Sequence, residues 1–114
     1  MAITVNDICS KADAKLLCGN GEREFCGVYV GDLLSRAMSH IEADNVWITI
    51  MANVNVVAVA TLTEPAAIIL AEGVTLPNDA LEGAKKNGIT VLTSPLTAYE
   101  LCLILNELSS EKKI

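Results

Sequence analysis

The sequence predicts an α/β domain in which a three-strand parallel β-α-β-α-β core follows an N-terminal helix and β-hairpin. Three short runs, at 46–50, 66–70 and 89–92, are apolar at nearly every position, which is typical of parallel strands covered by helices on both faces. The segments that join these runs have the length of helical crossovers. The chain has 114 residues, of which 52% are hydrophobic, so it can build one domain and is too short for two.

The N-terminal segment predicts a helix and then a hairpin. Thr4 is followed three residues later by a carboxylate, a capping pattern that predicts a helix over 5–12. The apolar run 15–18 and the alternating run 25–31 are typical of strands. Because the turn residues Asn20-Gly21 lie between the two runs, we expect them to pair antiparallel as a β-hairpin.

The middle of the chain predicts two helices. Asp32 stands where it would cap a helix over 33–41, in which apolar residues recur at helical spacing. The connection 53–63 is rich in valine, which favours strand by propensity. A helix is nevertheless expected there, because parallel neighbours need a crossover of about a dozen residues. Asn53 or Asn55 can supply its N-cap.

Two more helices are predicted in the last third of the chain. The segment 77–87 carries proline and acidic residues early and lysines late, which complements the helix dipole. Thr97 and Glu100 form a capping box before a leucine-rich stripe, so a C-terminal helix is expected to pack on the sheet. The domain is therefore expected to span residues 1–108, with 109–114 as a solvated tail.

Charge and length exclude several classes of partner. The chain has 8 Lys and Arg against 14 Asp and Glu, a net charge of −6, so neither nucleic acid nor an anionic membrane is an expected partner. The longest apolar stretch, 54–62, is much shorter than the ~20 residues of a membrane span. The N-terminus lacks the pattern of a signal peptide, and we expect a cytoplasmic protein.

The cysteines do not have the spacing of a metal site. Cys9, Cys18, Cys26 and Cys102 contain no C-x-x-C pair, and the single histidine, His40, is distant from all of them in the chain. Structural zinc ligands usually lie two to four residues apart, so neither a metal nor another cofactor is expected. Reduced thiols in the cytoplasm are the simplest interpretation. A thiol redox sensor that acts through Cys26 is an alternative function.

No complete catalytic signature is present. The chain contains neither a G-x-x-x-x-G-K-[ST] phosphate loop nor a G-x-S-x-G nucleophile elbow. These absences favour a non-catalytic protein. The competing class is a kinase-related enzyme or a phosphoacceptor protein that uses Ser35, Ser94 or Thr97.

A ligand site is expected beyond the carboxyl ends of the parallel strands, where open α/β sheets bind their ligands. The segments there offer amides, hydroxyls and two helix N-termini with free N–H groups, which suit a small anion or the edge of an adenine ring. The alternative is that these residues only cap helices. The candidate ligand-binding residues are Asn53, Asn55, Gly73, Thr93, Ser94 and Thr97.

The second predicted strand indicates self-association. It has few charges after Glu24, and one helix layer can cover only one face of a short two-stranded ribbon. Its other face or its edge would leave an apolar patch that monomers seldom expose. Two copies related by a two-fold axis would bury this patch on both subunits. We therefore expect a homodimer with Val28, Tyr29 and Val30 at the interface.

Four segments resemble the DRTGG domain family, and in particular its short stand-alone members. They are 27–35 (GVYVGDLLS), 44–50 (DNVWITI), 55–60 (NVVAVA) and 67–70 (AIIL), so the resemblance extends over nearly the whole chain. The order of elements is also similar to the N-terminal domain of HPr kinase/phosphorylase. The resemblance implies a regulatory, dimer-forming domain, such as those that accompany CBS pairs in regulated pyrophosphatases. Stand-alone relatives also imply a link to iron-only hydrogenase systems.

The chain departs from the residues that give the family its name. It has Val54-Asn55 where Asp-Arg would open a helix, and Ala71-Glu72-Gly73 where Thr-Gly-Gly would follow a strand. A ligand that depends on that arginine would be bound differently or not at all. The kinase label of some relatives belongs to a P-loop domain that this sequence lacks. The expected function is a non-catalytic regulatory or assembly module that forms a homodimer, binds a partner protein and has a nucleotide-like small molecule as its candidate ligand.

Overall fold

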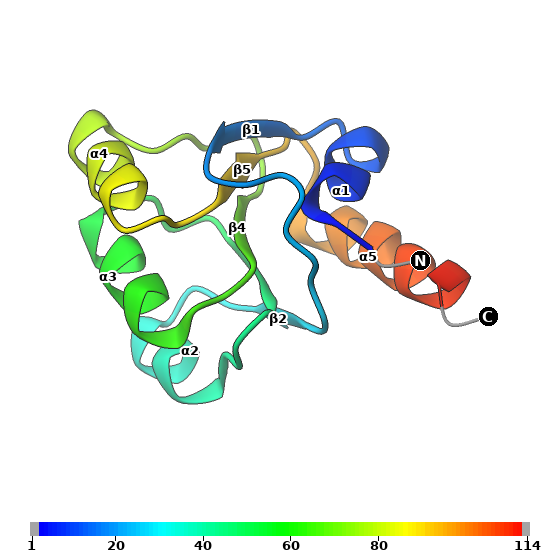
Figure 1. The fold of residues 1–114 in the computed structure, drawn as a ribbon, viewed down its shortest axis with the longest axis horizontal. Coiled ribbons are helices and arrows are strands. Elements are labelled where there is room, and N and C mark those ends of the chain that lie inside the picture. The colour runs from blue at the N-terminus through cyan, green and yellow to red at the C-terminus, as the bar shows by residue number, and fades with distance from the viewer. Residues whose placement is uncertain (1–2, 113–114) are drawn as a thin grey trace.

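A computed structural model describes residues 3–112 and contains five helices around one five-stranded sheet (Figure 1). The elements, in chain order, are α1 (Val5–Lys11), β1 (Lys15–Cys18), β2 (Val28–Val30), α2 (Leu34–His40), β3 (Val46–Thr49), α3 (Val54–Thr63), β4 (Ala67–Leu70), α4 (Asn78–Lys86), β5 (Val91–Thr93) and α5 (Ala98–Lys112). No helix within the described residues has the length and apolar character needed to cross a membrane.

The sheet has the strand order β1-β5-β4-β3-β2. Strands β2, β3, β4 and β5 are parallel, and the register places Trp47 of β3 between Tyr29 and Ile68. β1 joins β5 antiparallel at the opposite edge, with a register irregularity between Leu16 and Cys18. The predicted α/β class, the three-strand parallel core and the helix packed at the C-terminus are confirmed.

The predicted hairpin is wrong. β1 and β2 lie at opposite edges of the sheet and do not pair with each other. The Asn20-Gly21 turn packs instead against the start of β5, where the Asn20 N–H donates to Thr90 Oγ1 over 3.0 Å. Gly19 has a φ of +97°, and a Cβ there would lie 2.3 Å from the Thr90 Cα, so only glycine fits. The chain then passes α1, where Val5 N donates to Arg23 O over 2.9 Å, and enters β2 as a fourth parallel strand.

Helices cover both faces of the sheet and form two cores (Figure 1). α2, α3 and α4 pack on the face that carries Trp47, Ile68 and Val91, and the three buried valines of α3 contribute to that core. α1 and α5 pack on the other face, against Ile48 and Ile69. This three-layer arrangement explains why β3 and β4 are buried at every position.

Local capping signals place most helix boundaries. Asn53 caps α3, because its Oδ1 accepts from Asn55 N over 3.0 Å and from Val56 N over 3.1 Å. The valine-rich connection is therefore a helix, as expected from the crossover. Asp32, in contrast, does not cap α2: the N-cap position is Leu33, which forms no side-chain cap.

The C-terminal helix α5 continues to Lys112, beyond the predicted end at residue 108. Its capping box is present, with Thr97 N donating to Glu100 Oε1 over 3.0 Å and Glu100 N donating to Thr97 Oγ1 over 3.2 Å. A solvated tail was predicted over 109–114. The side chains after Ser109 lie outside the part of the chain that the structure describes.

Candidate functional site

The edge of the sheet at which β3, β4 and β5 end, here called the carboxyl edge, brings several of the predicted ligand-binding residues together. The Gly73 N–H donates to Ser94 O over 2.8 Å, and Glu72 N donates to Leu96 O over 2.8 Å. These bonds hold the segment after β4 against the segment after β5. Glu72 and Gly73 have φ values of +59° and +74°, two successive left-handed residues. A Cβ at Gly73 would meet nothing within 4 Å, so the surface above it is open.

The hydroxyls of Thr93 and Ser94 already have backbone partners. Thr93 Oγ1 donates to Val74 O over 2.6 Å. Ser94 is fully buried, donates to Ala12 O over 2.7 Å and accepts from Leu96 N over 3.2 Å. In this conformation, Ser94 positions the loop from within and presents no side-chain atom to solvent.

The remaining predicted ligand residues lie at helix starts. Asn53 caps α3, and Asn55 is an exposed residue in the first turn of that helix. Thr97 is exposed and takes part in the α5 capping box. The structure therefore groups Gly73, Thr93, Ser94 and Thr97 near one another, while Asn53 and Asn55 follow the neighbouring strand β3. The side chains of Asn53, Thr93, Ser94 and Thr97 each form a hydrogen bond that caps a helix or holds a loop. These bonds agree with the alternative in which the residues only cap helices, and the open surface above Gly73 leaves room for a ligand.

Asp32 also belongs to the carboxyl edge, although its place in the sequence predicts a helix cap. Its Oδ1 accepts from Thr49 Oγ1 over 2.6 Å and from Ile50 N over 2.9 Å. The carboxylate thereby joins the end of β2 to the end of β3. Only its place two residues after the apolar strand β2 could have indicated this role, and the helical spacing of the residues that follow favours a helix cap instead.

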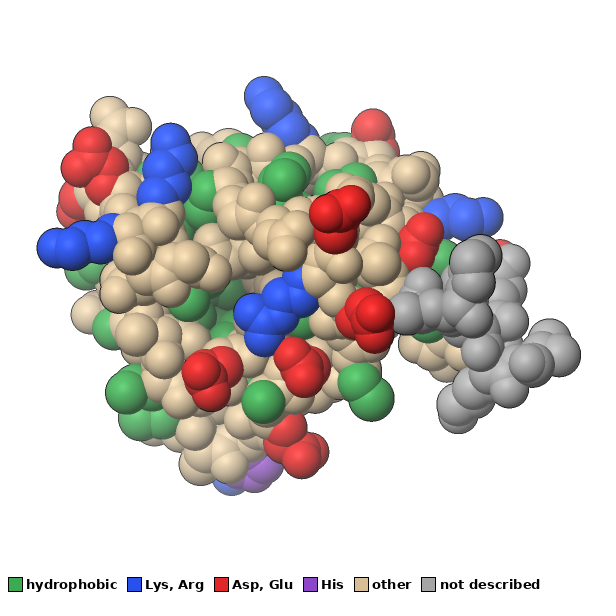
Figure 2. Space-filling view, viewed as in Figure 1, with side chains coloured by type: hydrophobic (Ala, Val, Ile, Leu, Met, Phe, Trp, Pro, Cys, Tyr) green, Lys and Arg blue, Asp and Glu red, His purple; other side chains and the backbone are tan. Residues whose placement is uncertain are grey.

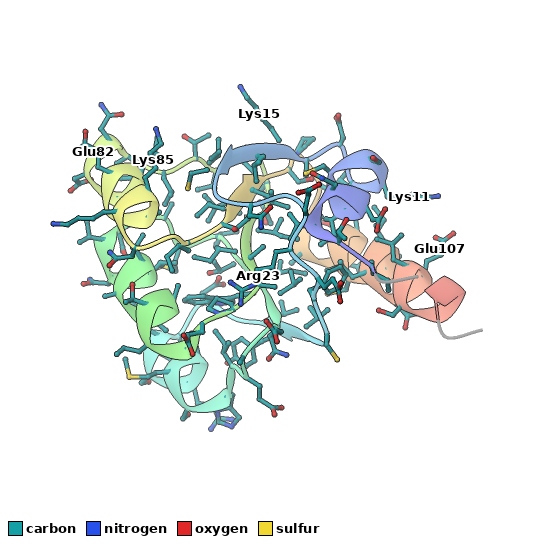
Figure 3. The ribbon with its side chains drawn as sticks, viewed as in Figure 1. Lys11, Lys15, Arg23, Glu82, Lys85 and Glu107 are labelled. Carbon is teal, nitrogen blue, oxygen red and sulfur yellow. The ribbon has the colours of Figure 1, made fainter. Side chains whose placement is uncertain are left out.

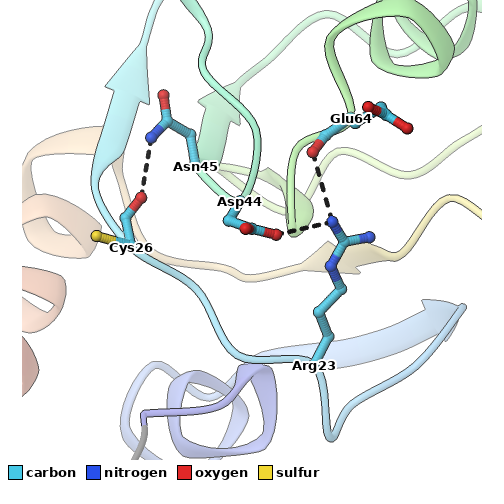
Figure 4. A network of polar contacts seen from close by, with 5 residues as sticks. All are labelled: Arg23, Cys26, Asp44, Asn45 and Glu64. Carbon is cyan, nitrogen blue, oxygen red and sulfur yellow. Dashed lines mark hydrogen bonds and ion pairs between the residues drawn. The ribbon is translucent and has the colours of Figure 1, made fainter.

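A polar network at the amino ends of β2, β3 and β4 was not predicted (Figure 4). Arg23 Nη2 donates to Asp44 Oδ1 over 3.0 Å and to Glu64 O over 3.5 Å, and Asn45 Nδ2 donates to Cys26 O over 2.9 Å. The network joins the loop before β2 to the residues before β3 and β4. Its members are far apart in the sequence and share no local pattern, so the network could not be predicted from the sequence.

Two open cavities, of about 370 and 300 Å³, flank this network, and both are lined by Arg23 and Asp44. Figure 3 places Arg23 near the centre of the face that Figure 2 shows, where several acidic side chains lie around a basic one. The larger cavity also includes Glu22 and Glu24. Because carboxylates outnumber the guanidinium, and the guanidinium already has two partners, these cavities are unsuited to a phosphate group.

The predicted interface residues lie on an edge strand but not on one face. Val28 and Val30 are 39% and 46% exposed, and they line a groove of about 330 Å³ together with Cys102, Leu105, Asn106 and Ser109 of α5. We call this the β2–α5 groove. Tyr29 points to the other face, where it packs against the core that contains Trp47 and stacks on His40 with ring centroids 6.3 Å apart.

A comparison with protein-family models matches the DRTGG domain over residues 7–108. The chain belongs to the DRTGG domain family. Among solved structures, its fold is similar to the CBS and DRTGG domains of the regulatory region of Clostridium perfringens pyrophosphatase, complexed with the activator diadenosine tetraphosphate. The TM-score is 0.76 at 24% identity, and the match covers 89% of this chain and 45% of that one. The comparison with curated proteins found no match.

The two segments at which the resemblance predicts a departure from the family's namesake residues both lie at the carboxyl edge. Val54 and Asn55 form the first turn of α3, and Ala71-Glu72-Gly73 follows β4. The second segment has the two left-handed residues described above. The expected resemblance to the family is confirmed.

The four thiols of the DRTGG domain are free and differ in exposure. Cys26 is exposed, whereas Cys18 is buried and donates its thiol to Ile89 O over 3.3 Å. Burial raises the pKa of Cys18, and it also raises the pKa of Cys9. Within the part of the chain that the structure describes, no cluster of three or more His, Cys, Asp or Glu side chains could hold a metal ion.

Proposed function

We propose that this DRTGG domain is a non-catalytic regulatory module that works as a homodimer in the cytoplasm, binds a nucleotide-like small molecule and acts on a partner protein. The observation that carries the proposal is the family match over residues 7–108. The similar fold of the pyrophosphatase domains supports it, because those domains form a regulatory region that binds a nucleotide activator.

The dimer is supported by the exposed edge strand and by the β2–α5 groove. Substitution Val28→Asp puts a charge on this surface and is expected to convert a dimer to a monomer at micromolar concentration, because a buried unpaired carboxylate is strongly unfavourable. Tyr29→Asp, on the other face of the strand, tests whether both faces are involved. Sedimentation velocity measures the outcome. A wild-type species of 12.1 kDa would refute the dimer, and a dimer that tolerates both substitutions would refute its location.

The ligand is proposed to bind at the carboxyl edge, near Asn53, Asn55, Gly73, Thr93, Ser94 and Thr97. The open surface above Gly73 and the start of α3 support this placement. Because Ser94 is buried, its contribution would be to position Gly73 through its carbonyl oxygen.

Calorimetric titration with diadenosine tetraphosphate tests the ligand site. We expect Asn55→Ala to weaken binding by about fivefold, the equivalent of one hydrogen bond of about 1 kcal/mol. Asn87→Ala is the matched control. Asn87 is exposed and lies between α4 and the amino end of β5, away from the carboxyl edge, so this variant should bind as the wild type does. Absence of binding at millimolar concentration, or equal weakening by both substitutions, would contradict the site.

The partner protein is proposed to belong to an iron-only hydrogenase system, as the resemblance to stand-alone relatives implies. Genes for such a system beside the gene for this chain would support the assignment. Co-sedimentation of the purified domain with an iron-only hydrogenase is the direct measurement. Independent migration of the two proteins at micromolar concentration would contradict it.

The competing class is a kinase-related enzyme or a phosphoacceptor protein. Of its candidate residues, Ser35 is exposed, Thr97 is exposed within a capping box, and Ser94 is buried. Incubation with labelled ATP separates the classes. We expect neither turnover nor stoichiometric labelling, and either result would replace the regulatory proposal with this one.

A further inference from the structure

The free edge of β2 presents a definite set of backbone groups. Val46 N donates to Gly27 O over 3.0 Å, and Gly31 N donates to Ile48 O over 3.2 Å. Bonds of a parallel ladder recur at every second residue, so Tyr29 also bonds to β3. The N–H and C=O groups of Val28 and Val30 therefore point away from the sheet. No hydrogen bond of these groups to a segment outside the sheet occurs within the described residues.

The two edges of the sheet differ in how they are protected. β1 begins with an exposed lysine, Lys15, and has a register irregularity, and both features discourage pairing with another strand. β2 has the sequence Val-Tyr-Val, with no charge, no proline and no irregularity in its pairing with β3. An uncharged and regular edge strand is a template for another strand.

We propose that two copies of this chain join their β2 strands antiparallel about a two-fold axis at Tyr29, making one continuous sheet through the dimer; this inference rests on the dimer of the proposed function. In this register, Val28 lies opposite the partner's Val30, and Val30 lies opposite the partner's Val28. Both pairs are of the hydrogen-bonded kind, because their N–H and C=O groups all face the axis. The four free groups of each strand are thereby satisfied.

Other symmetric registers place one valine of β2 opposite a residue outside the partner's β2. An axis at Val28 would place Val30 opposite the partner's Cys26, but the backbone of Cys26 is already engaged: its N–H donates to Asp44 O over 2.9 Å and its C=O accepts from Asn45 Nδ2 over 2.9 Å. An axis at Val30 would place Val28 opposite the partner's Asp32, which lies outside β2 in the connection to α2. The axis at Tyr29 is the one that pairs both valines with residues of the partner's β2.

The side chains near this axis are compatible with a second copy. Val28 and Val30 point toward the β2–α5 groove, and Cys102 and Asn106 of α5 line it without any charge. Tyr99 and Leu103 lie within one helical turn of these residues and are 71% and 51% exposed. A stable dimer buries about 800 Å² per partner, more than a three-residue strand supplies, so the uncharged flank of α5 must contribute.

Cysteine cross-linking tests the register. In a Cys26→Ser, Cys102→Ser background, Val28→Cys and Val30→Cys chains are prepared separately and oxidised alone or mixed. Hydrogen-bonded opposite pairs have Cα atoms about 5.5 Å apart, within the range of a disulfide, whereas the diagonal pairs are about 7–8 Å apart. The mixture should therefore give at least fivefold more disulfide-linked dimer than either chain alone. Leu16→Cys, at a similarly exposed position on β1, is the control and should not cross-link.

Amide hydrogen exchange is the second measurement, and it does not depend on disulfide formation. The Val28 and Val30 amides should exchange at least tenfold more slowly in the dimer than in a Val30→Lys monomer. Leu16→Lys should leave both the dimer and these amides unchanged. A monomeric wild type would refute the proposed dimer itself. A stable dimer with fast-exchanging Val28 and Val30 amides, or with equal cross-linking in all mixtures, would refute only the strand pairing and indicate a different contact between subunits.

Discussion

At the scale of single residues, the thiols show how burial alone separates chemically identical groups. Cys26 is exposed on the loop before β2, whereas Cys18 is buried at the end of β1 with its thiol hydrogen-bonded to a carbonyl. The exposure of Cys26 makes it the most accessible thiol with or without a sensing function. Rapid labelling of Cys26 would therefore not by itself support a redox sensor.

We predict an order of alkylation by iodoacetamide at pH 7.5 in which Cys26 reacts first and Cys18 last. Cys9 and Cys102, which are partly buried, should react at intermediate rates. The physical reason is that the thiolate is the nucleophile, and burial raises the pKa of Cys18 in addition to hindering access to it. Peptide mass spectrometry of timed samples measures the four rates. Labelling of Cys18 as fast as that of Cys26 would contradict the structure.

At the scale of elements, α3 is a helix although its sequence favours a strand, because it connects two parallel strands. Four valines in ten residues favour a strand, yet the segment is a helix between two parallel strands. Val56, Val57 and Val59 are buried against the sheet, so packing stabilises what propensity does not. A helix with weak propensity depends strongly on its cap.

Asn53→Ala is therefore expected to lower the free energy of unfolding by about 0.5–2 kcal/mol, because the first-turn N–H groups of Asn55 and Val56 lose their acceptor. Urea unfolding followed by circular dichroism measures the change. Asn55→Ala is the matched control and should stay within about 0.5 kcal/mol of the wild type, since its side chain forms no hydrogen bond with any other described residue. Equal effects of the two substitutions would show that the cap does not contribute.

At the scale of the whole molecule, a buried hydroxyl links the two ends of the chain. Ser94 lies between β5 and α5 and donates to Ala12 O at the end of α1, 82 residues away in sequence. Its oxygen also accepts from Leu96 N, and its carbonyl holds Gly73. Ser94 therefore connects the carboxyl edge to the layer formed by α1 and α5.

Ser94→Ala is expected to lower the free energy of unfolding by about 1–3 kcal/mol, because the buried Ala12 carbonyl and Leu96 N–H would lose their partner. Ser39→Ala removes an exposed hydroxyl that bonds only within its own helix turn and is expected to change stability by about 0.5 kcal/mol or less. Thermal and urea unfolding of both variants provide the comparison. A neutral Ser94→Ala would mean that the hydroxyl is not the anchor described.

The carboxyl edge was predictable as a place, but the roles of its residues were not. The rule that ligands bind beyond parallel strands requires only the strand directions, and these follow from the order of apolar runs and crossovers. Whether a hydroxyl faces a ligand or a carbonyl depends on neighbours from distant parts of the chain. Ser94 donates a hydrogen bond to Ala12 O, and Asp32 accepts one from Thr49 Oγ1. No local sequence pattern contains either pair.

The α/β class, the order of the helices, the capping of α1, α3 and α5, and the three parallel strands could all be predicted from the sequence. Each follows from short-range periodicity and from hydrogen bonds between neighbours. The partners of β1 and β2, in contrast, depend on contacts between distant parts of the chain. The Asn20-Gly21 turn is a valid reversal signal, but the free energy of strand pairing comes from the partner strand. Here β1 pairs with β5, and β2 pairs with β3 and extends the parallel sheet. The exposed edge of β2 follows from that choice.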